Sequence, residues 1–287
     1  MCDEITEAEN AEFVLNRREF AGLGAGAAAL ATLPGCATAA EAPTASRMVT
    51  INTPDGKADA FFVYPKKGKH PAVIMWPDIA GLRDAYKTMG TRLAAAGYAV
   101  LVVNQYYRSS PAPILNSLME WRTPAGQDKL KPMIAAITPS GTTSDAAAFV
   151  SWLDAQKEVN AKKRIGSAGY CMGGPFTVRT AFANPARVGA AASFHGGGLV
   201  GDAPDSPINL IAKTRAAYLF AIAQNDDERA PKEKTQLRAA ADAAKRPAEV
   251  EVYPAQHGWC TIDAPIYDRA QAEKAWGRML ALFKANL

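Results

Sequence analysis

The stretch GYCMGG places Cys171 between Gly169 and Gly173, in the spacing G-x-C-x-G that many hydrolases use around a nucleophilic serine. A strand is expected before it, at 164–170, and a helix after it, at 175–185. The turn between them must be sharp to lift a side chain clear of a sheet, and glycines tolerate that crowding. The N-terminus of a helix favours a thiolate. The pattern predicts Cys171 as a nucleophile; the alternative is a structural cysteine in a glycine-rich turn.

A thiol nucleophile needs a base, and the sequence offers three histidines. His257 follows the last predicted strand, in YPAQHGW, where the order nucleophile, acid, base places the base. His195 ends a strand at the same edge of the sheet and is a rival, although it more readily lines the substrate site. His70 precedes a strand and therefore belongs at the opposite edge. We predict His257 as the base.

The acid of the triad should follow the predicted strand AAYLFAIA (216–223), in the segment QNDDE. Asp226 is the carboxylate nearer the strand end, so it is the predicted partner of His257. Asp227 is the alternative. Whichever carboxylate is not used fits a solvated acidic turn before the next helix.

Two backbone N–H groups are expected to bind the oxyanion that forms on attack. One belongs to Met172, directly after the nucleophile, and the other to Ile79, in the loop WPDIAGL after an early strand. Asp78 then lies beside Cys171 and could share a proton with the thiol. The alternative role of Asp78 is to cap the following helix.

The residues expected to contact substrate are Tyr106, Arg108, His195 and Trp259. The first two belong to an irregular, proline-rich segment at 105–141, which we predict as a loop or partial cap over the carboxyl edge of the sheet. No C-x-x-C pair is present, and neither a metal ion nor a cofactor is predicted. Cys260 could form a disulfide with Cys171 under oxidising conditions, or it could be a small buried residue.

The rest of the chain alternates strands and helices. Continuous apolar runs at 71–76 and 98–104 predict strands buried on both faces, and a helix at 84–97 separates them. Such alternation predicts right-handed crossovers and a mostly parallel sheet. Two antiparallel strands precede it, at 47–53 and 58–65. Further helices are expected at 144–156, 231–244 and 268–287, and further strands at 187–197 and 248–254. The fold class is therefore α/β.

The first forty residues predict a twin-arginine export signal. Arg17 and Arg18 precede Phe20 and a weakly apolar run that is too short for a membrane span. ATAA (37–40) offers a cleavage site, and LPGC offers Cys36 as a lipidated residue; a disordered tail is the alternative. A linker at 41–47 and one domain at 48–287 complete the organisation. The expected location is outside the cytoplasm, in the periplasm.

The composition of the chain limits the classes of molecule that it is expected to bind. The 287 residues carry a net charge of +4, with 48% hydrophobic and 21% charged residues, as in ordinary globular proteins. Since no basic run is longer than AKKR (161–164), a nucleic-acid partner is not predicted. Contact with a membrane is expected only if Cys36 is lipidated. The predicted partner is a small-molecule substrate, and the protein should be a monomer or a dimer.

Together these motifs resemble the dienelactone hydrolase family, the carboxymethylenebutenolidases, over roughly 48–287. GYCMGG resembles the cysteine turn of that family, NDD and HGW its acid and base, and PDIAGL its loop with an acidic residue. The resemblance implies an α/β-hydrolase fold, with a mostly parallel central sheet flanked by helices.

In chemical terms the resemblance implies cleavage of a lactone or ester through a thioester. The family's loop carries a glutamate where this chain has the shorter Asp78. The arginine that follows the family's histidine is absent from HGWCTIDAP, and Arg108 or Arg122 could replace it. The alternatives are another acyl hydrolase, such as a thioesterase or peptidase, and a non-catalytic exported binding protein.

Overall fold

The computed structural model describes residues 42–287 of the chain. The expected export signal, with Arg17, Arg18 and Cys36, lies outside the described residues. The first strand begins at Thr44, so part of the segment expected as a linker belongs to the sheet. No helix in the described part combines the length and apolar character that crossing a membrane requires.

The described residues form one sheet of eight strands in the order β1-β2-β4-β3-β5-β6-β7-β8. β1 and β2 form an antiparallel hairpin, β2 pairs antiparallel with β4, and all later pairs are parallel. The strands are β1 (Thr44–Thr53), β2 (Gly56–Pro65), β3 (Ala72–Trp76), β4 (Ala99–Val103), β5 (Ile165–Tyr170), β6 (Val188–Phe194), β7 (Ala217–Ala223) and β8 (Ala248–Tyr253). The predicted α/β class and the mostly parallel sheet are confirmed.

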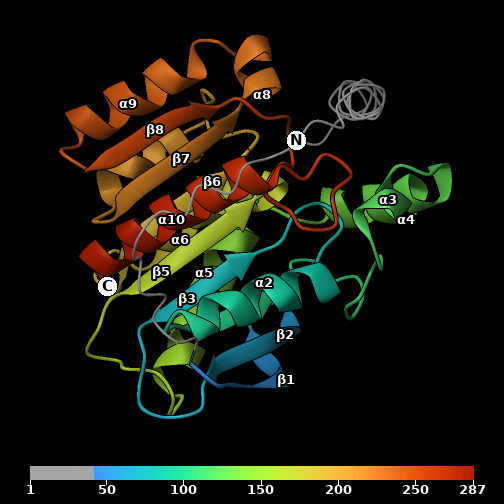
Figure 1. The fold of residues 1–287 in the computed structure, drawn as a ribbon, viewed down its shortest axis with the longest axis vertical. Helices are drawn as coiled ribbons and strands as arrows, with labels where there is room; N and C mark the ends of the chain where they lie inside the picture. Colours follow the sequence, from blue (N-terminus) through green and yellow to red (C-terminus); the bar gives the residue numbers. More distant parts are fainter. Residues whose placement is uncertain (1–41) are drawn as a thin grey trace, which may run out of the picture.

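Helices connect the parallel strands, as right-handed crossovers require. They are α2 (Asp84–Ala95), α3 (Leu118–Trp121), α4 (Pro124–Ala135), α5 (Pro139–Asp154), α6 (Gly174–Ala183), α7 (Pro207–Leu210), α8 (Gln224–Arg229), α9 (Glu233–Ala243) and α10 (Arg269–Asn286), with 3₁₀ turns η1 (Cys171–Gly173) and η2 (Ile211–Lys213). Figure 1 shows α2 and α10 over the near face of the sheet, while α5 and α6 pack against each other behind it.

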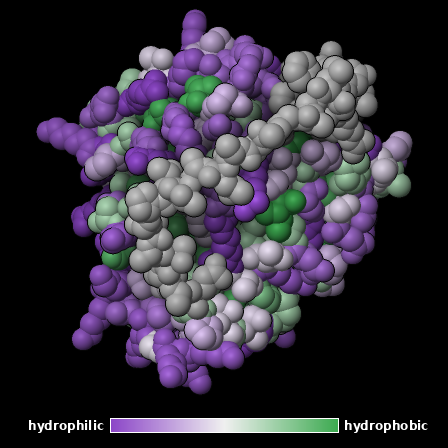
Figure 2. All heavy atoms as spheres, viewed as in Figure 1, coloured by the Kyte–Doolittle hydropathy of each residue, from purple (hydrophilic) through white to green (hydrophobic). Residues whose placement is uncertain are grey.

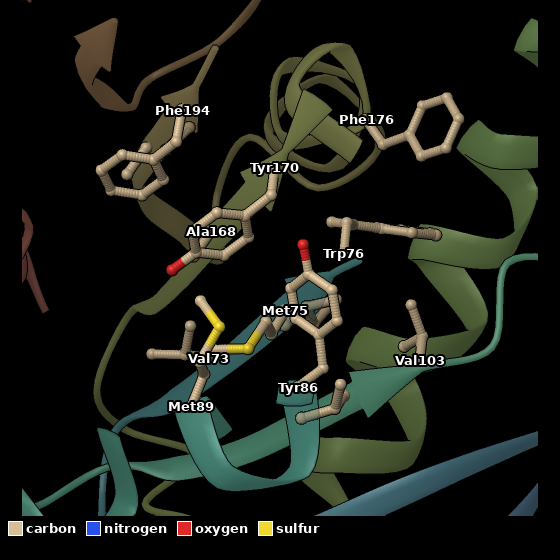
Figure 3. Packing of buried hydrophobic residues seen from close by; sticks show 14 of the residues in the cluster. Val73, Met75, Trp76, Tyr86, Met89, Val103, Ala168, Tyr170, Phe176 and Phe194 are labelled. Atoms are coloured by element: carbon tan, nitrogen blue, oxygen red, sulfur yellow. The ribbon is translucent and has the colours of Figure 1, made fainter. Parts of the chain in front are cut away.

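The core lies between the sheet and these helix layers. Every residue of β3, β4, β5, β6 and β7 is buried, because helices cover both faces of those strands. Figure 3 shows Tyr86 and Met89 of α2 packed below Tyr170, with Phe194 beside it. The rings of Tyr170 and Phe194 stack at 4.9 Å. On the face seen in Figure 2 hydrophilic residues predominate, and hydrophobic residues form small separate groups.

The segment expected to be irregular, 105–141, contains more helix than predicted. It holds α3, α4 and the start of α5, and α3 and α4 project from one side of the molecule (Figure 1). Thr123 and Thr138 cap α4 and α5 through their hydroxyl oxygens, and each is followed by a proline at the first helical position. The expected loop is therefore a small helical cap.

Candidate active site

Cys171 occupies a strained turn between β5 and α6. Its φ is +52°, in the left-handed region that side chains other than glycine rarely adopt. A Cβ at Gly169 would collide with the backbone of Gly173, and one at Gly173 would lie 2.7 Å from the carbonyl oxygen of Pro77. Only glycines fit at both positions, so the chain can turn sharply enough to place the Cys171 side chain beyond the strand end.

His257 lies in the loop after β8, and two residues at the end of β7 hold it. Its Nδ1 and the Oδ2 of Asp226 are 2.7 Å apart, while its backbone N–H donates to Oδ1 of Asn225 at 2.9 Å. The other candidate acid, Asp227, forms an ion pair with Lys234 at 2.6 Å. The structure therefore brings Asp226 rather than Asp227 to the histidine. Asn225 was not singled out from the sequence, although it stands directly before the predicted acid.

The charges around His257 favour its protonated form. Burial alone would lower the pKa of His257, but the charges of Asp226 and Cys171 outweigh burial and raise the pKa to about 10. Burial would raise the pKa of Asp226, yet the net effect of His257 is to lower it. An imidazolium held between a carboxylate and a sulfur can both stabilise a thiolate and donate a proton.

His195 is a second buried histidine against the same sulfur. It follows β6 with φ +39°, and its ring meets that of His257 at 4.7 Å between centroids. His195 is fully buried, and burial lowers its pKa although its interaction with Cys171 opposes that effect. The ligand atoms of Cys171, His195 and His257 all lie within 4.8 Å of one another. These three residues could hold a soft divalent metal ion.

The predicted oxyanion donors belong to two different loops. Met172 begins the first turn after Cys171, where backbone N–H groups have no intrahelical acceptor. Ile79 lies in the loop after β3, and its carbonyl accepts a 2.7 Å hydrogen bond from the Tyr106 hydroxyl. Gln105 donates to the carbonyl oxygen of Asp78 at 2.7 Å in the same loop. Tyr106, predicted to contact substrate, is buried and holds the loop in place instead.

The Asp78 carboxylate is paired with an arginine that the sequence reasoning missed. Asp78 lines the cavity that contains Cys171, but Arg83 donates to both of its oxygens, at 2.7 and 2.9 Å. Arg83 also donates two 2.7 Å hydrogen bonds to Asp263, in the loop after His257. The Asp78 carboxylate, which was expected to share a proton with the thiol, is held in this structure by a buried guanidinium.

Comparisons with known proteins agree with this geometry. The model of the dienelactone hydrolase family matches residues 58–287. The chain is 30% identical over 233 residues to an Escherichia coli protein named "putative carboxymethylenebutenolidase", covering 78% of this chain and 81% of that protein. A Salmonella typhi protein of the same name is 29% identical over 266 residues, covering 84% and 94%. The crystal structure of a "putative dienelactone hydrolase" from Klebsiella pneumoniae superposes with a TM-score of 0.69, at 25% identity, covering 84% and 99%. The chain belongs to the dienelactone hydrolase family.

Membership of the dienelactone hydrolase family makes the surroundings of Cys171 the place to look for substrate contacts. Arg108 is not among them, since its guanidinium binds Asp145 and Asp55 at 2.6–3.0 Å away from the cavity of Cys171. That cavity is lined instead by Arg122, which ends α3, and by Leu118. Of the two arginines named from the sequence, Arg108 and Arg122, only Arg122 lines the cavity of Cys171 among the described residues.

Two further residues named from the sequence, Trp259 and Cys260, lie outside the cavity of Cys171. Trp259, predicted to contact substrate, is fully buried, packs against His195 with 5.3 Å between ring centroids and does not line the cavity of Cys171. Its other face stacks on Tyr253 at 5.1 Å. Cys260 is a free buried thiol in a separate cavity under α2 and α10, so it does not face the sulfur of Cys171 across a shared space.

Proposed function

We propose that this member of the dienelactone hydrolase family is a thiol hydrolase of carboxylic esters or lactones, with Cys171 as nucleophile, His257 as base and Asp226 as the orienting acid. One observation carries the proposal. The 2.7 Å contact from His257 to Asp226 points the other ring nitrogen toward the sulfur-bearing turn, and Cys171 is held there at φ +52°. Strained backbone at a buried nucleophile is typical of catalytic turns.

In the acylation step the Cys171 thiolate attacks the carbonyl carbon of the substrate. The carbonyl oxygen becomes an oxyanion that the N–H groups of Ile79 and Met172 stabilise. The oxyanion then collapses, the bond to the leaving oxygen breaks, and the His257 imidazolium gives that oxygen its proton. The products are a thioester on Cys171 and a free alcohol, or the opened alcohol end of a lactone.

In the deacylation step His257 acts in reverse. It takes a proton from water as the oxygen attacks the thioester, and the same two N–H groups bind the second oxyanion. Collapse releases the carboxylic acid and restores the thiolate beside the imidazolium. Asp226 keeps Nδ1 of His257 occupied throughout, so that Nε2 is the nitrogen that transfers protons.

The cap provides a contact for an anionic substrate group next to the thiol. Arg122 lines the cavity of Cys171, and its guanidinium can bind a carboxylate in a two-point geometry. We assign to Arg122 the binding of a substrate carboxylate. Arg108 cannot bind it, because its guanidinium forms ion pairs with Asp145 and Asp55.

The test uses the purified full chain with a dienelactone and with p-nitrophenyl acetate. We expect hydrolysis of both, a covalent acyl adduct on Cys171 by mass spectrometry, and loss of both activity and adduct in Cys171→Ala. Cys260→Ala is the matched control, because it removes a buried thiol from a different cavity. Undiminished hydrolysis by Cys171→Ala would reject the nucleophile.

The same preparation distinguishes the alternatives. Faster hydrolysis of acyl thioesters than of esters would indicate a thioesterase. Faster hydrolysis of aminoacyl anilides would indicate a peptidase. A binding protein without catalysis would contain no thiol that iodoacetamide alkylates unusually fast at neutral pH, whereas the proposed ion pair makes Cys171 the fast-reacting thiol.

Export by the twin-arginine route is also a proposal, supported by the sequence of residues 1–40. Fusing these residues to a reporter that functions only outside the cytoplasm should give a signal. Replacing both Arg17 and Arg18 by lysine should abolish it. A signal that persists in the double variant would reject the route.

A further inference from the structure

Arg179, in the second turn of α6, is a buried cation for which the described residues provide no ion pair. Its side chain is only 7% exposed, and its Nη1 atom has no hydrogen-bond partner among the described residues. Burial lowers its pKa, and the charge of Asp205 opposes that effect. Asp205 itself is exposed and makes no hydrogen bond to Arg179 in the described part of the chain. A guanidinium buried in this way normally has a hydrogen-bonded anion beside it.

The position of Arg179 relates it directly to the catalytic turn. Met172, Phe176 and Arg179 are spaced four and three residues apart, so they share one face of the helix that begins at the nucleophile. Arg179 lies eight residues after Cys171, or about 12 Å along a helical axis. Long side chains lean toward the N-terminus of their helix, which brings the guanidinium back toward Met172.

A cavity of about 190 Å³ follows this same helix face. Its lining includes Met172, Phe176 and Arg179 and, from the cap, Ile134 and Ile137. Phe176 is held in place edge-on against Trp76 at 5.4 Å, as its position in Figure 3 illustrates. The part of the cavity wall formed by Phe176, Ile134 and Ile137 is therefore apolar.

Arg179 is not the only source of positive potential in this cavity. Thr138 and Pro139, which also line it, form the N-terminus of the 16-residue helix α5, whose partial positive charge favours an anion. A wider cavity of about 530 Å³ shares Arg179 and Pro139, and its lining also includes Lys213 and the carboxylate of Asp205. The arginine thus lies where an outer opening meets the space beside the catalytic turn.

We propose that this cavity is a second subsite, which binds an apolar substrate chain ending in a carboxylate, with the carboxylate on Arg179. The inference rests on the proposed function, because the other end of that chain carries the ester attacked by Cys171. It differs from the contact assigned to Arg122, which lines the small cavity around the thiol itself. The preferred substrate is therefore an ester whose anionic group is remote from the scissile bond.

The kinetic test compares the p-nitrophenyl monoester of suberic acid with its methyl-capped, neutral counterpart. We expect the wild type to prefer the anionic ester in kcat/KM. The ratio of the two kcat/KM values should fall about tenfold to a hundredfold in Arg179→Met, as for loss of a hydrogen bond to a charged group. Arg179→Lys should retain part of the preference. Lys284→Met, which removes an exposed cation from α10, a helix that lines neither cavity, is the control and should leave the ratio unchanged.

A binding test excludes a purely structural role. Free suberate should raise the Tm of the wild type and leave that of Arg179→Met unchanged. Without ligand, Arg179→Met should be at least as stable as the wild type, because it removes an unpaired buried charge. An unaltered substrate ratio in Arg179→Met would overturn the subsite. If the methionine variant cannot be purified, the substrate ratio of Arg179→Lys decides in its place. If the wild type hydrolyses neither ester, the proposed function fails, and suberate binding alone decides the subsite.

Discussion

The Arg83 guanidinium donates one hydrogen bond to each oxygen of the Asp78 carboxylate, and both side chains are almost completely buried. Burial alone would lower the pKa of Arg83, but Asp78 and Asp263 together raise it. Arg83 also donates to Asp263, and this second contact joins the loop that carries Ile79 to the loop that follows His257. It therefore couples the predicted oxyanion donor to the base by a rigid ionic contact.

Arg83→Met should destabilise the protein by about 3 kcal/mol, because it leaves the Asp78 carboxylate buried and unpaired. The double variant with Asp78→Leu should recover most of that loss, since no buried charge then remains without a partner. Urea denaturation of the two single variants and the double variant measures the coupling. Additive losses would show that the two side chains act independently.

Asp226→Asn should change the pH profile of kcat/KM. His257 donates a proton to the leaving group, and its pKa is raised to about 10, so activity should fall as pH rises through about 10. Removing the Asp226 charge should shift this alkaline limb toward the ordinary histidine value and lower kcat/KM about a hundredfold. Activity at saturating and limiting substrate from pH 5 to about 11 is the measurement. If the alkaline limb lies at the same pH in Asp226→Asn and in the wild type, His257 is not the group whose titration causes it.

The same raised pKa makes a prediction about stability. Because His257 binds its proton more tightly in the folded state, its contribution is complete below about pH 6.5 and is lost as pH rises from there to about 10. The free energy of unfolding of the wild type should therefore decline over this window more steeply than that of Asp226→Asn. If the free energy of unfolding declines equally steeply in the two proteins, Asp226 does not raise the pKa of His257.

Gly173→Ala should destabilise the catalytic turn by about 3 kcal/mol or more, because a Cβ there collides with the backbone of Trp76 and Pro77. Gly277→Ala is the matched control. It lies in the interior of α10 with open space around the added Cβ, so it should stabilise the protein by about 1 kcal/mol. Thermal unfolding of both variants tests this, and a Gly173→Ala protein of wild-type stability would mean that the turn can relax.

Zinc should inhibit the enzyme reversibly. Thiolate sulfur and imidazole nitrogen are the ligands that Zn²⁺ prefers, and the contact of Asp226 with His257 orients that ring as in many zinc sites. We expect a chelator to restore activity, and His195→Asn to weaken inhibition at least about tenfold relative to its own uninhibited rate. Asparagine tolerates the positive φ at this position. Equal inhibition of both proteins would exclude His195 as a ligand.

The elements that the sequence predicts well are those defined by local pattern. The turn around Cys171, the positions of Asp226 and His257 at strand ends, and the buried strands all follow from spacing and periodicity over a few residues. The cap helices carried a local signal as well. Thr123-Pro124 and Thr138-Pro139 are N-cap and first-turn pairs, and the prediction of a loop overlooked them.

The contacts that the sequence could not predict are those between distant segments. Arg83 and Asp263 are 180 residues apart, and the engagement of Arg108 depends on Asp55 and Asp145 in two other elements. A charged residue near a site is a plausible substrate contact until its counter-ion is known. Arg179 illustrates the reverse case, because the sequence does not show that this helical arginine is buried or that its Nη1 has no hydrogen-bond partner among the described residues.

The order of the strands also bears on synthesis of the protein. β8 pairs only with β7 at the edge of the sheet, and His257 follows it, so the base leaves the ribosome long after Cys171. A nascent chain that has passed β6 contains Cys171 and His195 but not yet the proposed base. Translation that stops before residue 257 therefore releases a product that lacks the imidazole which, in the proposed mechanism, transfers protons for the thiol.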